Sequence, residues 1–280
     1  MSMEYRQESR RRWAATASGW EARADALRRA TMPVSTWMVE AVAPQAGHDL
    51  LELAAGTGDT GFLAAELIEP GGTLISSDFV PEMLSAAQRR AESLGLRNVR
   101  FRQVDAEVID QPAASLDGVL CRWGYMLMAD PEAALRETRR VLRQGAHVAL
   151  AAWTGPEDNE WSAAPVRELT RRGLLEPVEG EGPGQFAWAR EGVIAEHLDA
   201  AGFVDYEVST VDFAMRFPSV EDWWLSQIDL SMRTADAAAR MDAAARADLL
   251  AALDAIAEPW RQDDGALAIP ARTWVAAASG

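Results

Sequence analysis

The sequence predicts an α/β fold, a doubly wound and mostly parallel sheet of seven strands, with N-terminal helices and helical insertions that form a substrate cap. Three observations predict it. Between residues 48 and 153, short apolar runs alternate with helical stretches, which is typical of βαβ units and hence of a parallel sheet. The first apolar run ends in a glycine-rich turn that opens a helix. The chain has 280 residues, long enough for one large sheet domain.

Residues 1–44 are predicted to be helical and to form a lid. Trp13 and Trp20 fall near helical spacing, and Pro33 suits the first turn of a second helix. The pattern then changes to strands, which are predicted at 48–53, 73–77, 99–104, 116–121 and 147–153. Helices are predicted between them at 59–68, 81–94 and 131–142.

After residue 153 the regular alternation stops. Residues 154–189 contain Pro156, Pro177 and Pro183, which indicates a loop-rich insertion with one helix at 164–173. The remaining elements are predicted as a helix at 190–201, a strand at 203–217, an Ala-rich helical block at 220–259 and a closing strand at 272–278. We therefore predict one main domain over 45–280 that carries cap insertions at about 154–189 and 218–268.

Composition excludes several classes of protein. The chain has 43 Asp plus Glu against 27 basic residues, a net charge of −16, and every basic residue is Arg. Without Lys there is no Schiff base to pyridoxal phosphate and no Walker A phosphate loop. The acidic balance argues against nucleic acid as the main partner, because neutralising phosphates needs a basic face.

The cysteine, histidine and hydropathy patterns argue against disulfides, metal sites and membrane spans. A single Cys121 excludes an internal disulfide framework and a Cys-based zinc site. The three His residues show no metal-ligand spacing, so we expect no metal. The N-terminus is polar, and no apolar run reaches the roughly 18 residues of a membrane span, so we expect a cytoplasmic protein.

The glycine-rich turn is the main candidate for a ligand site. Residues 52–61 read Glu-Leu-Ala-Ala-Gly-Thr-Gly-Asp-Thr-Gly, which lets the backbone approach a ligand at a helix N-terminus. Asp78 follows Gly58 by 78 − 58 = 20 residues, the spacing of a carboxylate that binds ribose hydroxyls. The same letters fit the dinucleotide fingerprint. An NAD(P)-dependent oxidoreductase therefore remains an alternative at this point.

Other residues favour a different ligand. Glu52 lies within or at the end of the first strand, where an acid is costly unless it is paired or hydrogen-bonded. It has no role with a pyrophosphate, but it can organise the loop beneath an ammonium-bearing ligand. Asp105 and Ala106 end the third strand, where a carboxylate and a backbone N–H can read the edge of an adenine.

Taken together, these motifs resemble those of the class I S-adenosylmethionine-dependent methyltransferases, in the branch similar to the ubiquinone/menaquinone-biosynthesis enzymes. The matching segments are 51–58, 77–84, 105–107, 116–122 and 140–145. The resemblance implies a Rossmann-like methyltransferase domain over 45–280, with S-adenosyl-L-methionine as cofactor and a small molecule as substrate.

The resemblance also implies which residues contact the cofactor. They are Glu52, Ala54, Gly56, Gly58, Asp78, Phe79, Met83, Asp105, Ala106 and Arg122. It places the two glycines under the methionine part and Asp78 on both ribose hydroxyls. It assigns Phe79 or Met83 to the adenine face, Asp105 to the adenine amino group, and the backbone around Arg122 to the neighbourhood of the cofactor's amino group.

Aromatic residues gather where a substrate would bind. Ligands of such sheets bind outside the carboxyl ends of the strands, and several of the eleven Trp lie in the corresponding loops or in the N-terminal helices. The predicted substrate-binding residues are Tyr5, Trp13, Trp20, Trp123, Tyr125, Trp153 and Trp188. Such walls suit an apolar or aromatic substrate, and their π faces stabilise a nearby sulfonium.

The expected chemistry is in-line methyl transfer to a C, N or O atom. Because the methyl group is already activated, the main task is to position the nucleophile and exclude water. No catalytic residue is assigned; Glu107, Asp130 and Glu160 are possible bases near the strand ends. A non-catalytic S-adenosylmethionine-binding protein remains an alternative, and a homo-oligomer is possible.

Overall fold

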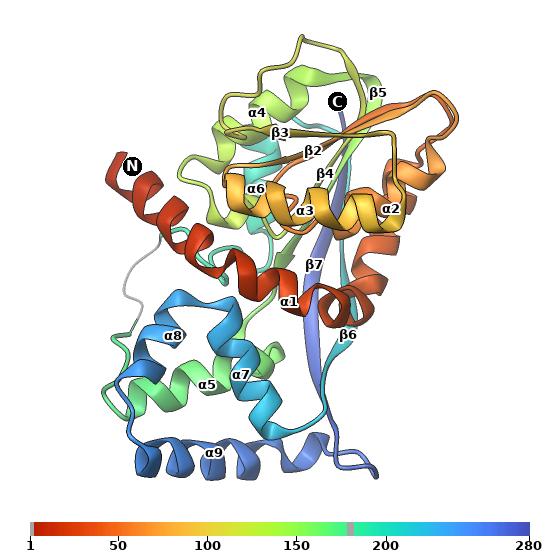
Figure 1. The fold of residues 1–280 in the computed structure, drawn as a ribbon. Coiled ribbons are helices and arrows are strands. Elements are labelled where there is room, and N and C mark those ends of the chain that lie inside the picture. The colour runs from red at the N-terminus through yellow and green to blue at the C-terminus, as the bar shows by residue number, and fades with distance from the viewer. Residues whose placement is uncertain (1–2, 178–181) are drawn as a thin grey trace.

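A seven-stranded sheet organises the molecule (Figure 1). The computed structural model describes residues 3–177 and 182–280. The strand order is β3-β2-β1-β4-β5-β7-β6. The strands are β1 (Asp49–Glu52), β2 (Thr73–Asp78), β3 (Val99–Gln103), β4 (Leu116–Arg122), β5 (Leu142–Trp153), β6 (Tyr206–Phe217) and β7 (Leu267–Ser279).

Strand directions confirm the predicted fold class. Strands β1 to β5 pair in parallel, while β7 runs antiparallel to both of its neighbours, β5 and β6. The fold is therefore α/β with a doubly wound, mostly parallel sheet. The chain leaves β1 toward β2 and β3, and then crosses to β4 and β5 on the other side. The crevice outside the carboxyl ends of β1 and β4 is thus the topological switch point, where ligands of such sheets bind.

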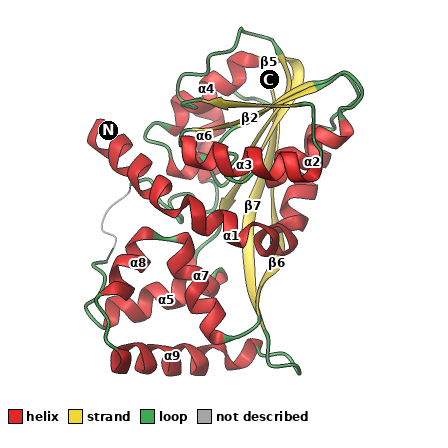
Figure 2. Ribbon diagram, in the orientation of Figure 1, coloured by secondary structure: helices red, strands yellow, loops and turns green. Residues whose placement is uncertain are grey.

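Helices cover both faces of the sheet (Figure 2). The helices are α1 (Met3–Val42), α2 (Asp59–Leu67), α3 (Pro81–Leu94), α4 (Pro131–Val141), α5 (Glu160–Arg171), α6 (Val193–Ala200), α7 (Val220–Leu230), α8 (Met232–Ala239) and α9 (Ala243–Ala257). One core, with Leu50 and Leu74, packs under α1, α2 and α3. The other, with Leu51 and Val119, packs under α4 and α6 and continues into the later helices.

Helix α1 corrects the prediction of separate N-terminal helices. It runs without interruption from Met3 to Val42, and Pro33 lies inside it and does not begin a new helix. The local signal of Pro33 is overridden by packing, because Val34 and Met38 directly after it are completely buried against the sheet. The C-terminal end of α1 thus belongs to the core.

Helices α5, α7, α8 and α9 gather at one end of the molecule, beyond the sheet (Figure 1). The predicted helical block at 220–259 is divided into three helices, and the helix predicted at 164–173 begins earlier, at Glu160. Residues 178–181 of the predicted first insertion lie outside the described residues. In the described part of the chain, no helix is long and apolar enough to cross a membrane.

Helix α1 crosses between this helical group and the sheet (Figure 1). Gly19 allows α1 to touch α7, because a Cβ there would overlap the Asp229 backbone. Arg23 binds Asp222 at 2.6 Å and Asp229 at 2.7 Å, so two ion pairs hold the same contact. The helix therefore links the sheet to the helical group.

Candidate cofactor and substrate site

The turn after β1 forms a cradle held by one carboxylate. The N–H of Gly56 donates to Asp78 Oδ2 and the N–H of Val80 donates to Asp78 Oδ1, both at 2.9 Å. Burial raises the pKa of Asp78 to about 6, although these backbone hydrogen bonds oppose the shift. Ala54 (φ 50°) and Trp123 (φ 59°), after β1 and β4, adopt the left-handed conformation. Such backbone strain in non-glycine residues clusters at functional sites.

Glu52 lies beneath the turn and is nearly inaccessible to solvent. Its Oε1 accepts from the N–H of Gly61 at 2.8 Å, and its Oε2 accepts from the Ser76 hydroxyl at 3.4 Å. Desolvation raises the pKa of this carboxyl to about 7, against the lowering effect of the Gly61 hydrogen bond. A buried acid with few partners suits a site that receives a positively charged group.

Replacing Glu52 by Gln should raise the free energy of unfolding at alkaline pH. The folded-state pKa of about 7 exceeds the ordinary carboxyl pKa of 4.5, so the charged form opposes folding. This penalty is complete above pH 7 and disappears as the pH falls toward 4.5. At about 1.4 kcal/mol per pKa unit, E52Q should raise the free energy of unfolding by about 2–3 kcal/mol at pH 8 and by much less at pH 5.

Urea unfolding of wild type and E52Q at the two pH values measures this effect. The exposed Glu66 on α2 provides the control E66Q, which should change little at either pH. A difference between wild type and E52Q that does not change with pH would contradict the raised pKa.

Gly56 and Gly58 play different parts in the turn. Both have positive φ, 54° and 86°. A Cβ on Gly56 would meet only open space, whereas a Cβ on Gly58 would overlap the Phe62 ring. A side chain at Gly58 would therefore face helix α2 and not the open side of the turn, and the contact of Gly58 with the cofactor stays a prediction.

The two glycines should consequently differ on mutation. G56V would fill the cradle with a side chain whose Cβ meets no protein atom within 4 Å, so we expect loss of S-adenosylhomocysteine binding with a small decrease in Tm from the positive φ. G58V should lower the Tm much more, because its side chain displaces Phe62. Calorimetry and thermal melts separate the two effects. Equal Tm values for both variants would contradict this assignment.

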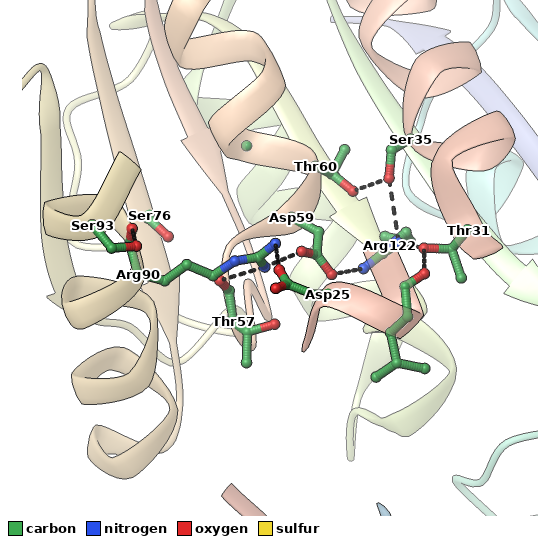
Figure 3. Close-up of polar contacts among 12 residues, drawn as sticks. Asp25, Thr31, Ser35, Thr57, Asp59, Thr60, Ser76, Arg90, Ser93 and Arg122 are labelled. Atoms are coloured by element: carbon green, nitrogen blue, oxygen red, sulfur yellow. Dashed lines mark hydrogen bonds and ion pairs between the residues drawn. The ribbon is translucent and has the colours of Figure 1, made fainter. Parts of the chain in front are cut away.

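A buried ionic network joins the turn to helix α1 (Figure 3). Asp59, the first residue of α2, accepts from Arg122 of β4 at 3.1 Å and also pairs with Arg90 of α3. Arg122 in turn donates to Thr31 and Ser35 of α1. Both charges of the Asp59–Arg122 pair are mostly buried. Removing one partner would leave a buried charge unpaired, which is strongly destabilising.

A single cavity of about 1110 Å³ opens above the turn. It exceeds the usual range of roughly 300–1,000 Å³ for small-molecule sites, so it has room for a cofactor and a second molecule. Nine of the ten predicted cofactor residues line it: Glu52, Ala54, Gly56, Asp78, Phe79, Met83, Asp105, Ala106 and Arg122. The structure thus brings together residues from four separate segments of the chain.

The predicted substrate residues divide into two groups around the cavity. Trp13 and Trp20 line it, 5.7 Å apart, but they pack with Phe79 and Met83 at the predicted adenine side. Trp123 and Trp153 also line it and stack at 4.2 Å. Trp161 stands 5.3 Å from Trp153 and extends this second wall.

Tyr125 and Trp188 are not brought to the cavity. Tyr125 is 1% exposed, and its hydroxyl lies 2.7 Å from the Thr138 hydroxyl in the core under α4. Trp188, also buried, stacks on Tyr125 and on His197 of α6. The two residues therefore belong to the core under α4 and α6.

The N-terminal turns of α1 close one side of the cavity. Arg6 pairs with both Asp105 and Glu107, and the Tyr5 hydroxyl donates to the Leu127 carbonyl at 2.8 Å. The Arg10 guanidinium stands 5.8 Å from the centre of the Phe79 ring. The residues predicted to read adenine are therefore in contact with the predicted lid.

Only one of the possible bases faces the cavity. Glu107 lines it, beside Arg6. Asp130 instead caps helix α4 by accepting from the N–H of Ala133, and Glu160 pairs with Arg167 on α5. Within residues 3–177 and 182–280, no group of three or more His, Cys, Asp or Glu side chains could hold a metal ion.

Some lining residues escaped the sequence analysis. Met215, Ser162, Gln185 and Gln227 come from β6, α5, the 182–189 loop and α7. Only the alternation of β6 could have indicated Met215. The others carry no motif, since they reach the cavity through the packing of the helical group.

Comparison with known proteins identifies the family of the chain. A family model described as a methyltransferase domain matches residues 44–166. Nocamycin O-methyltransferase of Saccharothrix syringae is 31% identical over 198 residues, which cover 68% of this chain and 71% of that protein. Demethylmenaquinone methyltransferase of Thermus thermophilus is 36% identical over 118 residues, 42% of this chain and about half (53%) of that protein.

Solved structures share the fold. The YcgJ protein of Bacillus subtilis superposes with a TM-score of 0.55 at 21% identity, covering 88% of this chain and 97% of that one. At this identity the likeness concerns the fold alone.

Proposed function

Because the chain belongs to the class I S-adenosylmethionine-dependent methyltransferase family, we propose that it transfers a methyl group from S-adenosyl-L-methionine to a small apolar or aromatic molecule. One observation carries the proposal: a single cavity contains both the Gly56–Asp78 cradle and the Trp123–Trp153 wall. Cofactor and acceptor could therefore meet without crossing a barrier of protein.

The residues present fit this cofactor. The open space at Gly56 admits a ligand against the backbone, and Asp78 offers carboxylate oxygens for ribose hydroxyls. Glu52 lines the same cavity, where its carboxylate suits a molecule with an ammonium group, while Asp105 and Glu107 are paired with Arg6. When bound, the cofactor would supply an activated methyl group.

The chain's own residues would perform the remaining tasks. Asp78 would orient the ribose, and the aromatic wall would hold the acceptor in line and exclude water. Of the predicted 1–44 lid, we propose that the N-terminal part of α1 closes the cavity, since Tyr5 and Arg6 hold it across the cavity. The C-terminal part belongs to the core, so only the N-terminal part would have to move for ligands to exchange.

Two measurements test the proposed function. Calorimetry should detect S-adenosylhomocysteine binding, and tight binding of NADH in its place would favour an oxidoreductase. A panel of small phenols, quinols, indoles and amines with methyl-labelled cofactor should then yield a labelled product. Cofactor binding without transfer to any acceptor would favour the non-catalytic alternative.

A further inference from the structure

The same cavity contains a buried amide whose oxygen has no protein partner among the described residues. Gln227 of α7 is 7% exposed and lines the cavity. Its Nε2 donates to the Ser226 hydroxyl at 3.2 Å, and that hydroxyl donates its only hydrogen to the Trp223 carbonyl at 2.7 Å. The amide nitrogen must therefore face Ser226. Its Oε1 keeps no hydrogen-bond partner among the described residues, although it is not sealed from solvent.

A second amide repeats this arrangement. Gln185, in the loop after the undescribed residues, lines the same cavity. Its Nε2 donates to the Ser162 hydroxyl at 2.9 Å, and its Oε1 has no partner within the described part of the chain. Two carbonyl oxygens from separate elements therefore remain available as hydrogen-bond acceptors.

Two indoles of the Trp123–Trp153–Trp161 wall use their N–H groups in hydrogen bonds within the protein, so a ligand would contact their ring faces. Trp123 Nε1 donates to Thr273 at 2.9 Å, and Trp161 Nε1 donates to Asn159 at 3.4 Å. A ligand would thus meet flat apolar surfaces and, at Gln185 and Gln227, acceptors. A ligand that fills the cavity would exclude water from these two oxygens, so a ligand that supplies a donor is preferred over one that leaves them unpaired.

We propose that Gln227 and Gln185 are specificity residues for the methyl acceptor, which is a flat apolar or aromatic molecule carrying hydroxyl or N–H donors. This inference rests on the proposed function and names its substrate class. An amide oxygen is not a base at neutral pH, so the two residues orient the donor groups and do not remove their protons. The position of Gln227 is fixed because the ion pairs of Arg23 hold α7 against α1.

Matched probes test the inference. With saturating S-adenosylhomocysteine, calorimetry compares dihydroxynaphthalene, with one hydroxyl on each ring, with its dimethoxy analogue and with naphthalene. Wild type should bind the diol at least about tenfold more tightly than the dimethoxy compound. Q227L should lose most of this preference, and Q185L part of it, while naphthalene and S-adenosylhomocysteine bind as before.

Controls separate a role in recognition from a role in folding. Gln144, exposed on β5 away from the cavity, provides Q144L, which should keep the wild-type preference. Equal affinity of wild type for the diol and the dimethoxy compound, or absence of binding by both, overturns the inference while S-adenosylhomocysteine binding upholds the cofactor site. A preference that persists in Q227L and Q185L also overturns it. Loss of S-adenosylhomocysteine binding by wild type would instead refute the proposed function.

Discussion

Asp78→Ala should weaken S-adenosylhomocysteine binding by about 2–4 kcal/mol, because two charge-assisted hydrogen bonds to ribose are lost. A second effect adds to the first. The same carboxylate accepts hydrogen bonds from the N–H groups of Gly56 and Val80 at 2.9 Å, so D78A also removes the contacts that fix the conformation of the turn. Titration calorimetry at pH 8, above the pKa of about 6 for this carboxyl, measures the loss.

The pH dependence of wild-type binding provides a further check on Asp78. Since the pKa of this carboxyl is about 6, S-adenosylhomocysteine affinity should decrease as the pH falls below 6 and the acceptor becomes protonated. D110A, at an exposed position in the loop after β3, is the matched control and should bind as wild type does. Unchanged affinity in D78A would remove Asp78 from the cofactor site.

Deletion of residues 1–30 should leave a folded protein that transfers methyl at least about a hundredfold more slowly, because nucleophile positioning and water exclusion are lost. The deletion point is chosen from the structure. It removes Tyr5, Arg6 and Trp20 from the cavity but retains Thr31, which binds Arg122, and the buried Val34. Single-turnover assays with an acceptor from the panel, together with thermal melts, measure both consequences.

A milder variant keeps this prediction decisive if the shortened chain folds poorly. R6M breaks the contacts with Asp105 and Glu107 while retaining the whole of α1. We expect faster S-adenosylhomocysteine dissociation in stopped-flow measurements and only a small decrease in Tm, because the Glu107 carboxylate loses its ion pair. R29M, at an exposed position on the same helix that does not line the cavity, is the control. Full activity per folded molecule in both the deletion variant and R6M would show that α1 packs against the rest of the protein without acting as a lid.

Local signals explain why some elements were predicted correctly. Helix α3 runs from Pro81 to Leu94 as predicted, because Pro81 occupies its first turn and Gly95 closes it in the left-handed conformation. The strands of the parallel sheet were found from their apolar runs, since strands buried on both faces need continuous hydrophobicity. In each case the signal lies within a few residues of the element it determines.

Local signals failed where distant packing decides. Pro33 was read as a helix start, yet burial of Val34 and Met38 carries α1 through it. Tyr125 and Trp123 are two residues apart, but only Trp123 reaches the cavity. Composition shows that Trp is abundant; it does not tell which rings face solvent, core or ligand.

The sequence by itself determined the sheet, the glycine turn and the carboxylate at Asp78, because these depend on spacing along the chain. Only the tertiary structure decided how the cavity is closed and what it can recognise. Arg6 meets Asp105 across 99 residues of sequence, and Gln227 lines the cavity from α7, which packs on both α1 and α5. Such contacts form where elements distant in sequence pack together, so the residues adjacent to them in the chain cannot predict them.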